Sequence, residues 1–170
     1  MWLERLAERT VSWTMGKIIT LTEAAQTRGT RVFTNGVFDI LHVGHARYLQ
    51  AARALGGCLI VGLNSDTSAR ALKGAQRPLV PQEERAELLA ALACVDCVVI
   101  FDETTAERVV AAIRPEVYVK GGDYALGADA KVPPEAAVVQ AYGGRVVFLP
   151  FSAGKSSTNV VQEILRRYGP

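Results

Sequence analysis

From Arg31 onward, short apolar runs rich in β-branched residues alternate with longer segments that have a helical period. Strands of a parallel sheet are apolar along their whole length, because helices cover the sheet on both faces. The alternation therefore predicts an α/β domain, doubly wound around about five parallel strands with helices on both faces. The expected strands are Arg31 to Thr34, Cys58 to Leu63, Cys97 to Ile100, Val117 to Val119 and Arg145 to Leu149.

The helical segments between these strands carry signals at their ends. Thr104 and Glu107 fit a capping box, Gly56 and Gly143 fit helix ends, and Pro133 fits the first turn of a helix. In Rossmann-like sheets of this kind, ligands bind beyond the carboxyl ends of the strands, so chemistry is expected in the loops there. We expect helices at about His45 to Leu55, Gln82 to Leu92, Thr104 to Ile113, Pro133 to Tyr142 and Thr158 to Tyr168.

The 170 residues, of which 49% are hydrophobic and 21% charged, suit a single compact domain. We expect this domain to span residues 31–170, after an N-terminal appendage of residues 1–30. A net charge of +2 without blocks of like charge excludes a stripe for nucleic acid or a membrane surface. The first residues lack the apolar stretch of a signal peptide, and no run approaches the roughly 20 apolar residues of a membrane span, so a cytoplasmic protein is expected.

The three cysteines, Cys58, Cys94 and Cys97, argue against a disulfide framework, because their number is odd and no export signal is present. Cys94 and Cys97 form a C-x-x-C inside an apolar run, with no second Cys or His pair nearby. Two small buried side chains are the favoured interpretation, and redox or metal chemistry is the alternative. We expect no dedicated metal site.

Both histidines, His42 and His45, lie in the segment T-N-G-V-F-D-I-L-H-V-G-H, which follows the first expected strand. A spacing of three at a strand-to-helix turn places the two imidazoles on one side of the helix start. Gly44 lets a phosphate approach the backbone N–H groups there. Imidazoles that donate hydrogen bonds to a phosphoryl group stabilise the charge that builds on its oxygens during displacement. The alternative is a helix cap together with one core histidine.

Polar residues also follow the second expected strand and the loop after it. Asn64 and Asp66 come directly after that strand, where capping of the next helix is the alternative to ligand binding. Lys73 lies in a polar loop with Arg77, where a cation could fold over a phosphate when the substrate binds, or could remain solvated.

Two further segments fit phosphate or sugar binding. After the fourth strand, the run from Lys120 to Asp123 holds two glycines that let main chain approach a ligand, although a plain turn also fits. Before the last helix, Ser156, Ser157 and Thr158 offer hydroxyls to the outer phosphates of a triphosphate, although an ordinary N-cap also fits. A P-loop is excluded because its first glycine would fall at Leu149.

The segment with the two histidines resembles the signature of the cytidylyltransferase-like branch of the nucleotidyltransferases. The resemblance extends to V-G-L-N-S-D, L-K-G, R-P, E-R and V-K-G-G-D-Y, which together are similar to the bacterial D-glycero-D-manno-heptose 1-phosphate adenylyltransferases. It covers roughly Lys17 to the C-terminus. One departure is Glu163, which stands where a basic residue is expected in the last helix.

The resemblance implies transfer of AMP from ATP to a sugar 1-phosphate, giving ADP-heptose for lipopolysaccharide core precursors and releasing pyrophosphate. Mg²⁺ would arrive with the nucleotide. The resemblance also implies a homo-oligomer, a dimer or higher. Because the chain lacks an attached sugar-kinase domain, we expect the kinase that acts upstream to be a separate protein.

The resemblance also assigns roles to individual residues. Catalysis would involve His42, His45 and Lys73. The nucleotide would be bound by Thr34, Asn35, Gly36, Phe38, Asp39, Gly44, Lys120, Gly121, Asp123, Ser156, Ser157 and Thr158. The sugar phosphate would be bound by Asn64, Asp66, Arg77, Arg85 and Gly122.

Several alternatives remain open. A cytidylyltransferase for glycerol phosphate or an alcohol phosphate, or an FMN adenylyltransferase, would have the same histidine motif, although K-G-G-D and L-K-G look more like the heptose group. A nucleotide-binding module without catalysis is disfavoured by the intact histidine pair. A thiol protein would use Cys94 and Cys97.

Overall fold

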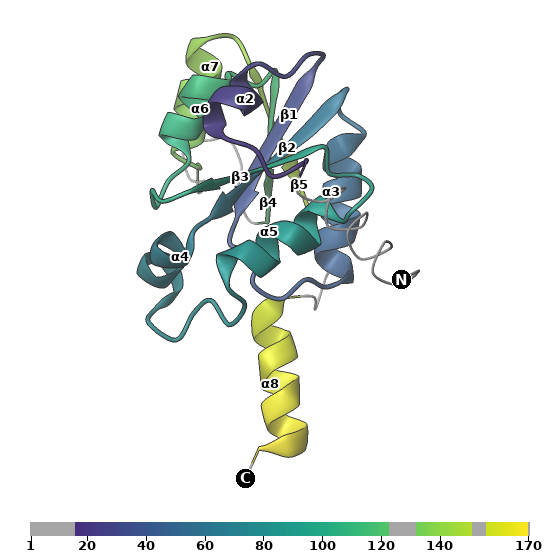
Figure 1. Cartoon of the computed structure of the whole chain (residues 1–170), viewed down its shortest axis with the longest axis vertical. Coiled ribbons are helices and arrows are strands. Elements are labelled where there is room, and N and C mark those ends of the chain that lie inside the picture. Colours follow the sequence, from purple (N-terminus) through teal and green to yellow (C-terminus); the bar gives the residue numbers. More distant parts are fainter. Residues whose placement is uncertain (1–15, 123–131, 151–155, 170) are drawn as a thin grey trace, which may run out of the picture.

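A computed structural model describes residues 16–122, 132–150 and 156–169. Its centre is a five-stranded parallel sheet in the order β3-β2-β1-β4-β5 (Figure 1). The chain builds one half outward from β1, then crosses to the other side of β1 to add β4 and β5. This confirms the predicted doubly wound α/β class. The strands are β1 (Arg31–Gly36), β2 (Cys58–Asn64), β3 (Cys97–Phe101), β4 (Val117–Gly121) and β5 (Arg145–Leu149).

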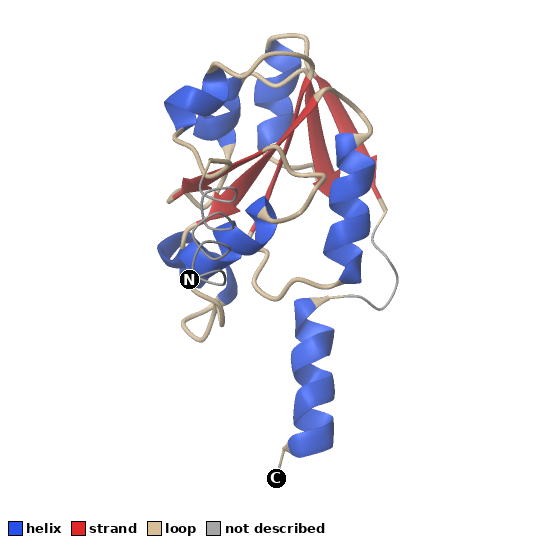
Figure 2. Ribbon diagram, turned by 45° about the vertical axis from the view of Figure 1, so that its right-hand side comes forward, coloured by secondary structure: helices blue, strands red, loops and turns tan. Residues whose placement is uncertain are grey.

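Helices pack on both faces of the sheet, because alternate strand residues point to opposite sides. Val32 of β1 packs with α3 and α5 in one core, whereas its neighbour Phe33 packs with α2, α6 and α7 in the other. Figures 1 and 2 show α2, α6 and α7 gathered on one side and α3 on the other. The helices are α2 (Leu21–Ala25), α3 (Val43–Arg53), α4 (Asp66–Lys73), α5 (Gln82–Ala90), α6 (Glu107–Ile113), α7 (Glu135–Ala141) and α8 (Ser157–Tyr168).

Residues 17–25 belong to this body, although we predicted an appendage up to residue 30. The backbone of Lys17 and Ile19 bonds to Val98 beside the edge strand β3, and Ala24 of α2 is fully buried. Thr20 and Glu23 form a capping box at the start of α2. Residues 1–15 lie outside the described residues, so the rest of the predicted appendage stays a prediction.

Two of the predicted helix ends are wrong. The capping box at Thr104 is absent, because α6 begins only at Glu107; the buried carboxylate of Glu135 accepts a hydrogen bond from the Ala106 N–H instead. Pro133 precedes the start of α7 by two residues rather than lying in its first turn.

The glycine signals have different physical causes. Gly143 has the left-handed φ of 83° expected just after a helix end. Gly56 follows the end of α3 for reasons of packing, since a Cβ there would lie 2.6 Å from a methyl of Val32. Helix α4 was not predicted, although Ser65 caps its start and Gly74, with φ of 95°, ends it.

Candidate active site

The two histidines stand at the start of α3, at the carboxyl end of β1. His42 occupies the N-cap position in an extended conformation, and its side chain does not cap the helix. The rings of His42 and His45 stack with centroids 3.9 Å apart and planes 19° apart. Among the described residues, none accepts a hydrogen bond from the N–H groups of Val43 and Gly44. These N–H groups and the two imidazoles therefore form a site suited to an anion.

Phe38 explains how the G-x-F-D part of the motif holds these rings in place. Its backbone adopts a left-handed φ of 47°, which is costly for a residue with a Cβ. The ring then turns back, is buried, and meets the ring of His45 edge-on at 5.3 Å. A Cβ at Gly36 would lie only 3.1 Å from the Phe38 ring, so glycine leaves the space that this turn needs.

His45 is held in its neutral form by its surroundings. Burial lowers its pKa, the neighbouring His42 lowers it further, and a backbone hydrogen bond at Ile40 opposes both, giving a pKa of about 4. Its Nδ1 is buried and has no hydrogen-bond partner among the described residues. At neutral pH the ring is therefore an uncharged imidazole with a single N–H, which can donate either to the Ile40 carbonyl or, in its place, to a ligand oxygen.

Asp39 is buried and serves as an anchor for the loop between α4 and α5. Its Oδ2 accepts from Nη1 of Arg77 at 2.5 Å, and its Oδ1 accepts from the backbone N–H groups of Leu79 at 2.7 Å and Val80 at 3.0 Å. Burial raises the pKa of this carboxyl, but the three hydrogen bonds outweigh burial and hold the pKa below its usual value. We had predicted nucleotide contact for Asp39; both of its oxygens instead bind protein.

Arg85 is fully buried, so the structure does not support its predicted contact with substrate. Its guanidinium donates to the carbonyls of Val37, Asn64 and Val80 and pairs with Asp66 at 2.7 Å. These partners lie in the loop of residues 37–42 between β1 and α3, which we call the histidine loop, at the end of β2, in the loop before α5, and in α4. Arg85 therefore fixes four segments of the site edge relative to one another. Its burial could not be read from a helix in which Arg is usually exposed.

Three other predicted contact residues of this region face protein. Thr34 is fully buried, and its hydroxyl lies 2.6 Å from that of Tyr48. Asn64 is buried and donates to Ser68 at 2.9 Å. Asp66 is partly exposed but pairs with Arg85. The side chains of Thr34 and Asn64 therefore bind protein, and contact of these two residues with a ligand stays a prediction.

The structure brings Asn35 and Lys120 together from neighbouring strands. Oδ1 of Asn35 accepts from Nζ of Lys120 at 3.0 Å and from the hydroxyl of Tyr118 at 2.9 Å. β1 and β4 are the pair at which the strand order reverses, which is where open α/β sheets bind ligands. Sequence reasoning missed Tyr118, since its position in an apolar strand indicates a core residue.

The last helix meets the histidine loop through its first residues. Ser156 caps α8 by accepting from the Asn159 N–H at 3.1 Å, and the hydroxyl of Ser157 donates to the carbonyl of Ile40 at 3.3 Å. Thr158 is exposed in the same turn. The predicted serine segment therefore lies beside the loop that leads to the H-x-G-H turn.

The remaining predicted residues are placed as follows. Lys73 is the exposed last residue of α4 and not part of a loop, and it makes no ion pair among the described residues. Gly121 ends β4, and Gly122 follows it with a left-handed φ of 102°. Asp123 lies outside the described residues. Arg77 is mostly buried in its pair with Asp39, which leaves little of its guanidinium for a substrate.

The cysteines are in poor positions for thiol chemistry. Burial raises the pKa of Cys97 to about 12 and also raises the pKa of Cys94. Thiols, unlike thiolates, are weak nucleophiles and weak metal ligands. Within the described residues, no group of three or more Cys, His, Asp or Glu side chains is placed to hold a metal ion.

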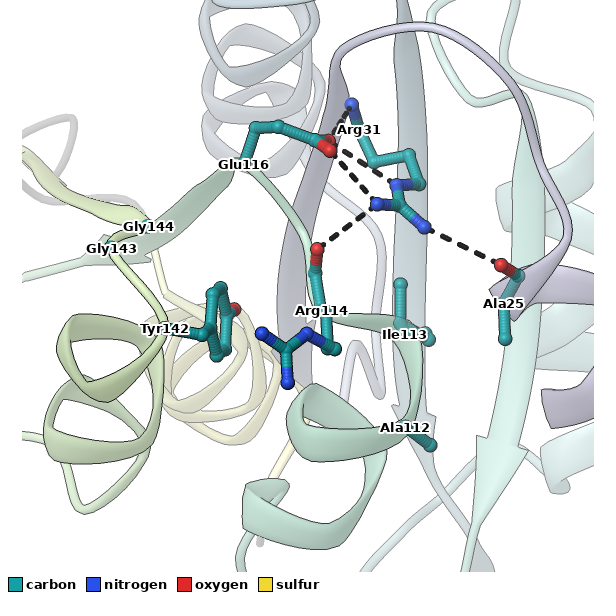
Figure 3. Close-up of a pocket in the computed structure, with 9 residues that line it drawn as sticks. All are labelled: Ala25, Arg31, Ala112, Ile113, Arg114, Glu116, Tyr142, Gly143 and Gly144. Atoms are coloured by element: carbon teal, nitrogen blue, oxygen red, sulfur yellow. Dashed lines mark hydrogen bonds and ion pairs between the residues drawn. The ribbon is translucent and has the colours of Figure 1, made fainter.

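A pocket of about 380 Å³ lies at the amino ends of the strands, opposite the histidines, where β1 and β4 begin (Figure 3). Arg31 spans it and pairs with Glu116 at 2.8 Å, while its other donors reach the carbonyls of Ala25 and Arg114. Arg114 lies over the ring of Tyr142 at 4.8 Å. The charged groups of Arg31 and Glu116 bind each other, and this ion pair connects the starts of β1 and β4. We therefore do not interpret the pocket as a second reactive centre.

Comparison with known proteins agrees with this geometry. The model of the cytidylyltransferase-like family matches residues 33–163, a range that includes the histidine turn and most of α8. The chain belongs to this family. This confirms the predicted membership of the cytidylyltransferase-like branch.

The curated relatives are longer proteins. The bifunctional protein HldE of Geobacter sulfurreducens is 55% identical over 147 residues, which are 86% of this chain and 29% of that protein. HldE of Streptomyces coelicolor is 54% identical over 130 residues, covering 76% of this chain and 27% of that protein. The chain therefore spans less than a third of the curated relatives that it matches.

A solved structure has a similar fold. The lipopolysaccharide core biosynthesis protein from Thermoplasma volcanium superposes with a TM-score of 0.58 at 28% sequence identity, covering 74% of this chain and 98% of that one. No helix in the described part of the present chain is long and apolar enough to cross a membrane.

Proposed function

We propose that this domain transfers AMP from ATP to D-glycero-D-manno-heptose 1-phosphate, giving ADP-heptose and pyrophosphate. The observation that carries the proposal is the stacked pair of His42 and His45 at a helix start with open N–H groups, beside the strands where the sheet reverses its order. Relatives named HldE and a structural neighbour from lipopolysaccharide core biosynthesis support the heptose as acceptor.

The chemistry would be an in-line attack by a phosphate oxygen of the sugar phosphate on the α-phosphorus of ATP. The bond from the α-phosphorus to the bridging oxygen would break and pyrophosphate would leave. Mg²⁺ bound to the nucleotide would offset the negative charge of its phosphates. The imidazoles of His42 and His45 would donate hydrogen bonds to oxygens that gain charge, and the start of α3 would hold the triphosphate. This is catalysis by positioning and charge stabilisation.

Other residues would bind around this centre. Lys120 would neutralise phosphate charge from β4, and Asn35 would orient its ammonium group through their 3.0 Å hydrogen bond. Ser156, Ser157 and Thr158 would hold the outer phosphates, while Gly36, Gly44, Gly121, Gly122 and Asp123 would let the ligand approach main chain or accept its hydroxyls. Lys73, at the exposed end of α4, would reach the site only when substrate binds.

A kinase that makes the sugar 1-phosphate would act before this domain, and the product would be used for lipopolysaccharide core precursors. A homo-oligomer and a cytoplasmic location stay predictions of the sequence.

The deciding experiment measures pyrophosphate release from each nucleoside triphosphate with Mg²⁺ and heptose 1-phosphate. We expect release with ATP and the heptose. Release only with CTP, or only with glycerol phosphate, an alcohol phosphate or FMN as acceptor, would retain the mechanism and reject this substrate pair.

Replacement of His45 by Ala tests the role of the histidine turn. We expect turnover to fall by about 10²–10³-fold with little change in KM, because the hydrogen bond forms to charge that develops in the transition state. Glu116→Gln, at the amino ends of the strands, is the matched control. Turnover of the His45 variant equal to that of this control would sink the assignment.

A further inference from the structure

Helix α8 exposes an apolar stripe that the rest of the described chain does not cover. At about 100° per residue, five apolar side chains fall on one side of the helix. None of the twelve residues of α8 is buried, and Ile164, Leu165 and Tyr168 are 51%, 61% and 82% exposed. Figures 1 and 2 both show α8 extending away from the body. The stripe consists of Val160, Val161, Ile164, Leu165 and Tyr168.

An uncovered α8 is a problem for the active site and not only for the helix. A single helix of this length is marginal in water without packing on its apolar side. Its first turn holds Ser156, Ser157 and Thr158, and Ser157 bonds to Ile40 of the histidine loop. Whatever covers the stripe therefore also keeps this turn ordered beside the histidines.

The polar side of α8 has little free charge. Arg166 and Arg167 both pair with Glu163, so the three side chains sum to one positive charge. An anionic membrane would need a more basic helix, usually with larger aromatic residues on its apolar side. A protein surface that is modestly acidic and partly apolar suits α8 better.

This chain offers such a surface on the outer side of α5. Glu83, Glu84 and Glu87 are exposed there and make no ion pair among the described residues. Leu88 in the same helix is 49% exposed, and Leu79 just before it is 56% exposed. Figure 1 shows α5 at the end of the body from which α8 extends.

We propose that α8 binds a second copy of this chain in a two-fold arm exchange. The two α8 helices, each about 18 Å long, would lie antiparallel with their stripes in contact, and the last turn of each would meet α5 of the other copy. Arg167 flanks the stripe and would face the acidic side of α5. This deepens the predicted homo-oligomer by naming its surface. The association stands by itself, whereas its effect on catalysis rests on the proposed function.

Sedimentation velocity over a range of protein concentrations tests the association. We expect a reversible dimer for the unaltered chain. Leu165→Glu should raise the dissociation constant at least about tenfold, because it places a carboxylate in an apolar contact. Gln162→Glu adds the same side chain on the opposite side of α8 and should leave the dimer intact. A monomer at every concentration, or equal dimerisation of both variants, would overturn the proposal.

Charge exchange tests the α5 contact. Glu87→Lys should weaken the dimer, and adding Arg167→Glu to that variant should restore it. An unweakened Glu87→Lys dimer would overturn the assignment of α5. Binding of the monomer to phosphatidylglycerol vesicles with loss of the dimer would identify a membrane as the occupant and would also reject the proposal.

Activity separates this inference from the proposed function. For the unaltered chain, pyrophosphate release per molecule should rise with concentration in step with dimer formation, and Leu165→Glu should lose that dependence. A dimer without pyrophosphate release from any substrate pair would reject the function and leave the association standing. Release that is independent of dimerisation would reject the catalytic link.

Discussion

At the scale of single residues, the environment of each side chain decides its chemistry more than its type does. The pKa of His45 is lowered to about 4, because the ring is buried and lies beside His42. Asp39 and Arg85 are charged residues that the fold uses as internal fasteners, since each has its polar atoms bound by protein. The same carboxyl or guanidinium on an exposed loop would be free to bind a phosphate or a sugar hydroxyl.

The lowered pKa of His45 predicts how stability depends on pH. Between its ordinary value of 6.5 and about 4, the unfolded chain binds a proton that the folded chain does not. The free energy of unfolding should therefore not depend on His45 above pH 6.5, and it should fall as the pH drops from 6.5 toward 4. Melting temperatures of the unaltered chain and His45→Gln, measured from pH 4 to pH 8, should differ in slope only below pH 6.5. Parallel slopes would contradict the shifted pKa.

Arg85 should be needed for folding stability as well as for the site. Replacement by Met removes a buried charge and leaves Asp66 and three carbonyls without their donor, which should cost about 3–5 kcal/mol of unfolding free energy. Urea denaturation measures this change. Arg114→Met, which removes an exposed guanidinium, is the control and should cost well under half as much. Equal losses would mean that the network around Arg85 is not important.

At the scale of elements, the loop from Gly74 to Pro81 behaves as part of the histidine turn. Asp39 holds it through Arg77, Leu79 and Val80, although these residues are separated from Asp39 by 38 to 41 positions in the chain. The carboxyl end of the sheet is thus assembled from loops that bind one another. A site whose walls are fixed by such contacts has a lower entropy cost of positioning reactants.

Asp39→Asn should loosen this connection without changing the size of the side chain. The amide loses the charge opposite Arg77 and offers only one carbonyl oxygen, so we expect a loss of about 1–3 kcal/mol in unfolding free energy. In the pyrophosphate assay, KM should rise together with a fall in turnover, because the loop borders the site without touching the reacting atoms. Unchanged kinetics in a destabilised variant would show that the loop has a structural role alone.

At the scale of the whole molecule, the carboxyl and amino ends of the parallel strands have different roles, and we call them the carboxyl edge and the opposite edge of the sheet. The carboxyl edge gathers the histidines, Lys120 and the start of α8, whereas the opposite edge joins strand ends through Arg31 and Glu116. The hydrogen bond to Arg31 lowers the pKa of Glu116 to about 2, against an ordinary value of 4.5. Changes at this second edge should therefore alter stability and leave turnover unaffected.

Glu116→Gln tests this separation. Because the side chain is 47% exposed, we expect a loss of only about 0.2–1 kcal/mol at neutral pH. The ionised carboxylate stabilises the fold above pH 4.5, and that contribution disappears as the pH falls toward 2. The unaltered protein and the variant should therefore become equally stable as the pH falls through that range, which thermal melts can show. At neutral pH their turnover should be equal. A large loss of turnover would contradict the independence of the two edges.

The strands, most of the helices and the histidine turn could be predicted from the sequence, because hydrophobic period and motif spacing are local properties. Strand β5 even has its predicted bounds. Helix α4 was missed, although Ser65 and Gly74 provided the signals of its ends. The capping box at Thr104 was predicted wrongly, because the acceptor for the Ala106 N–H comes from Glu135, 29 residues away.

Only the tertiary structure decided which polar residues face the site. Arg85 donates to Val37, 48 positions away in the chain, and Thr34 in β1 contacts Tyr48 in α3. The burial of Arg85 and Thr34 therefore does not follow from their neighbours in the sequence. The sequence by itself determined the H-x-G-H turn, since this motif needs only one turn of helix to bring its two rings together. Inward or outward direction elsewhere depends on packing between distant segments, and packing exists only once the sheet has formed.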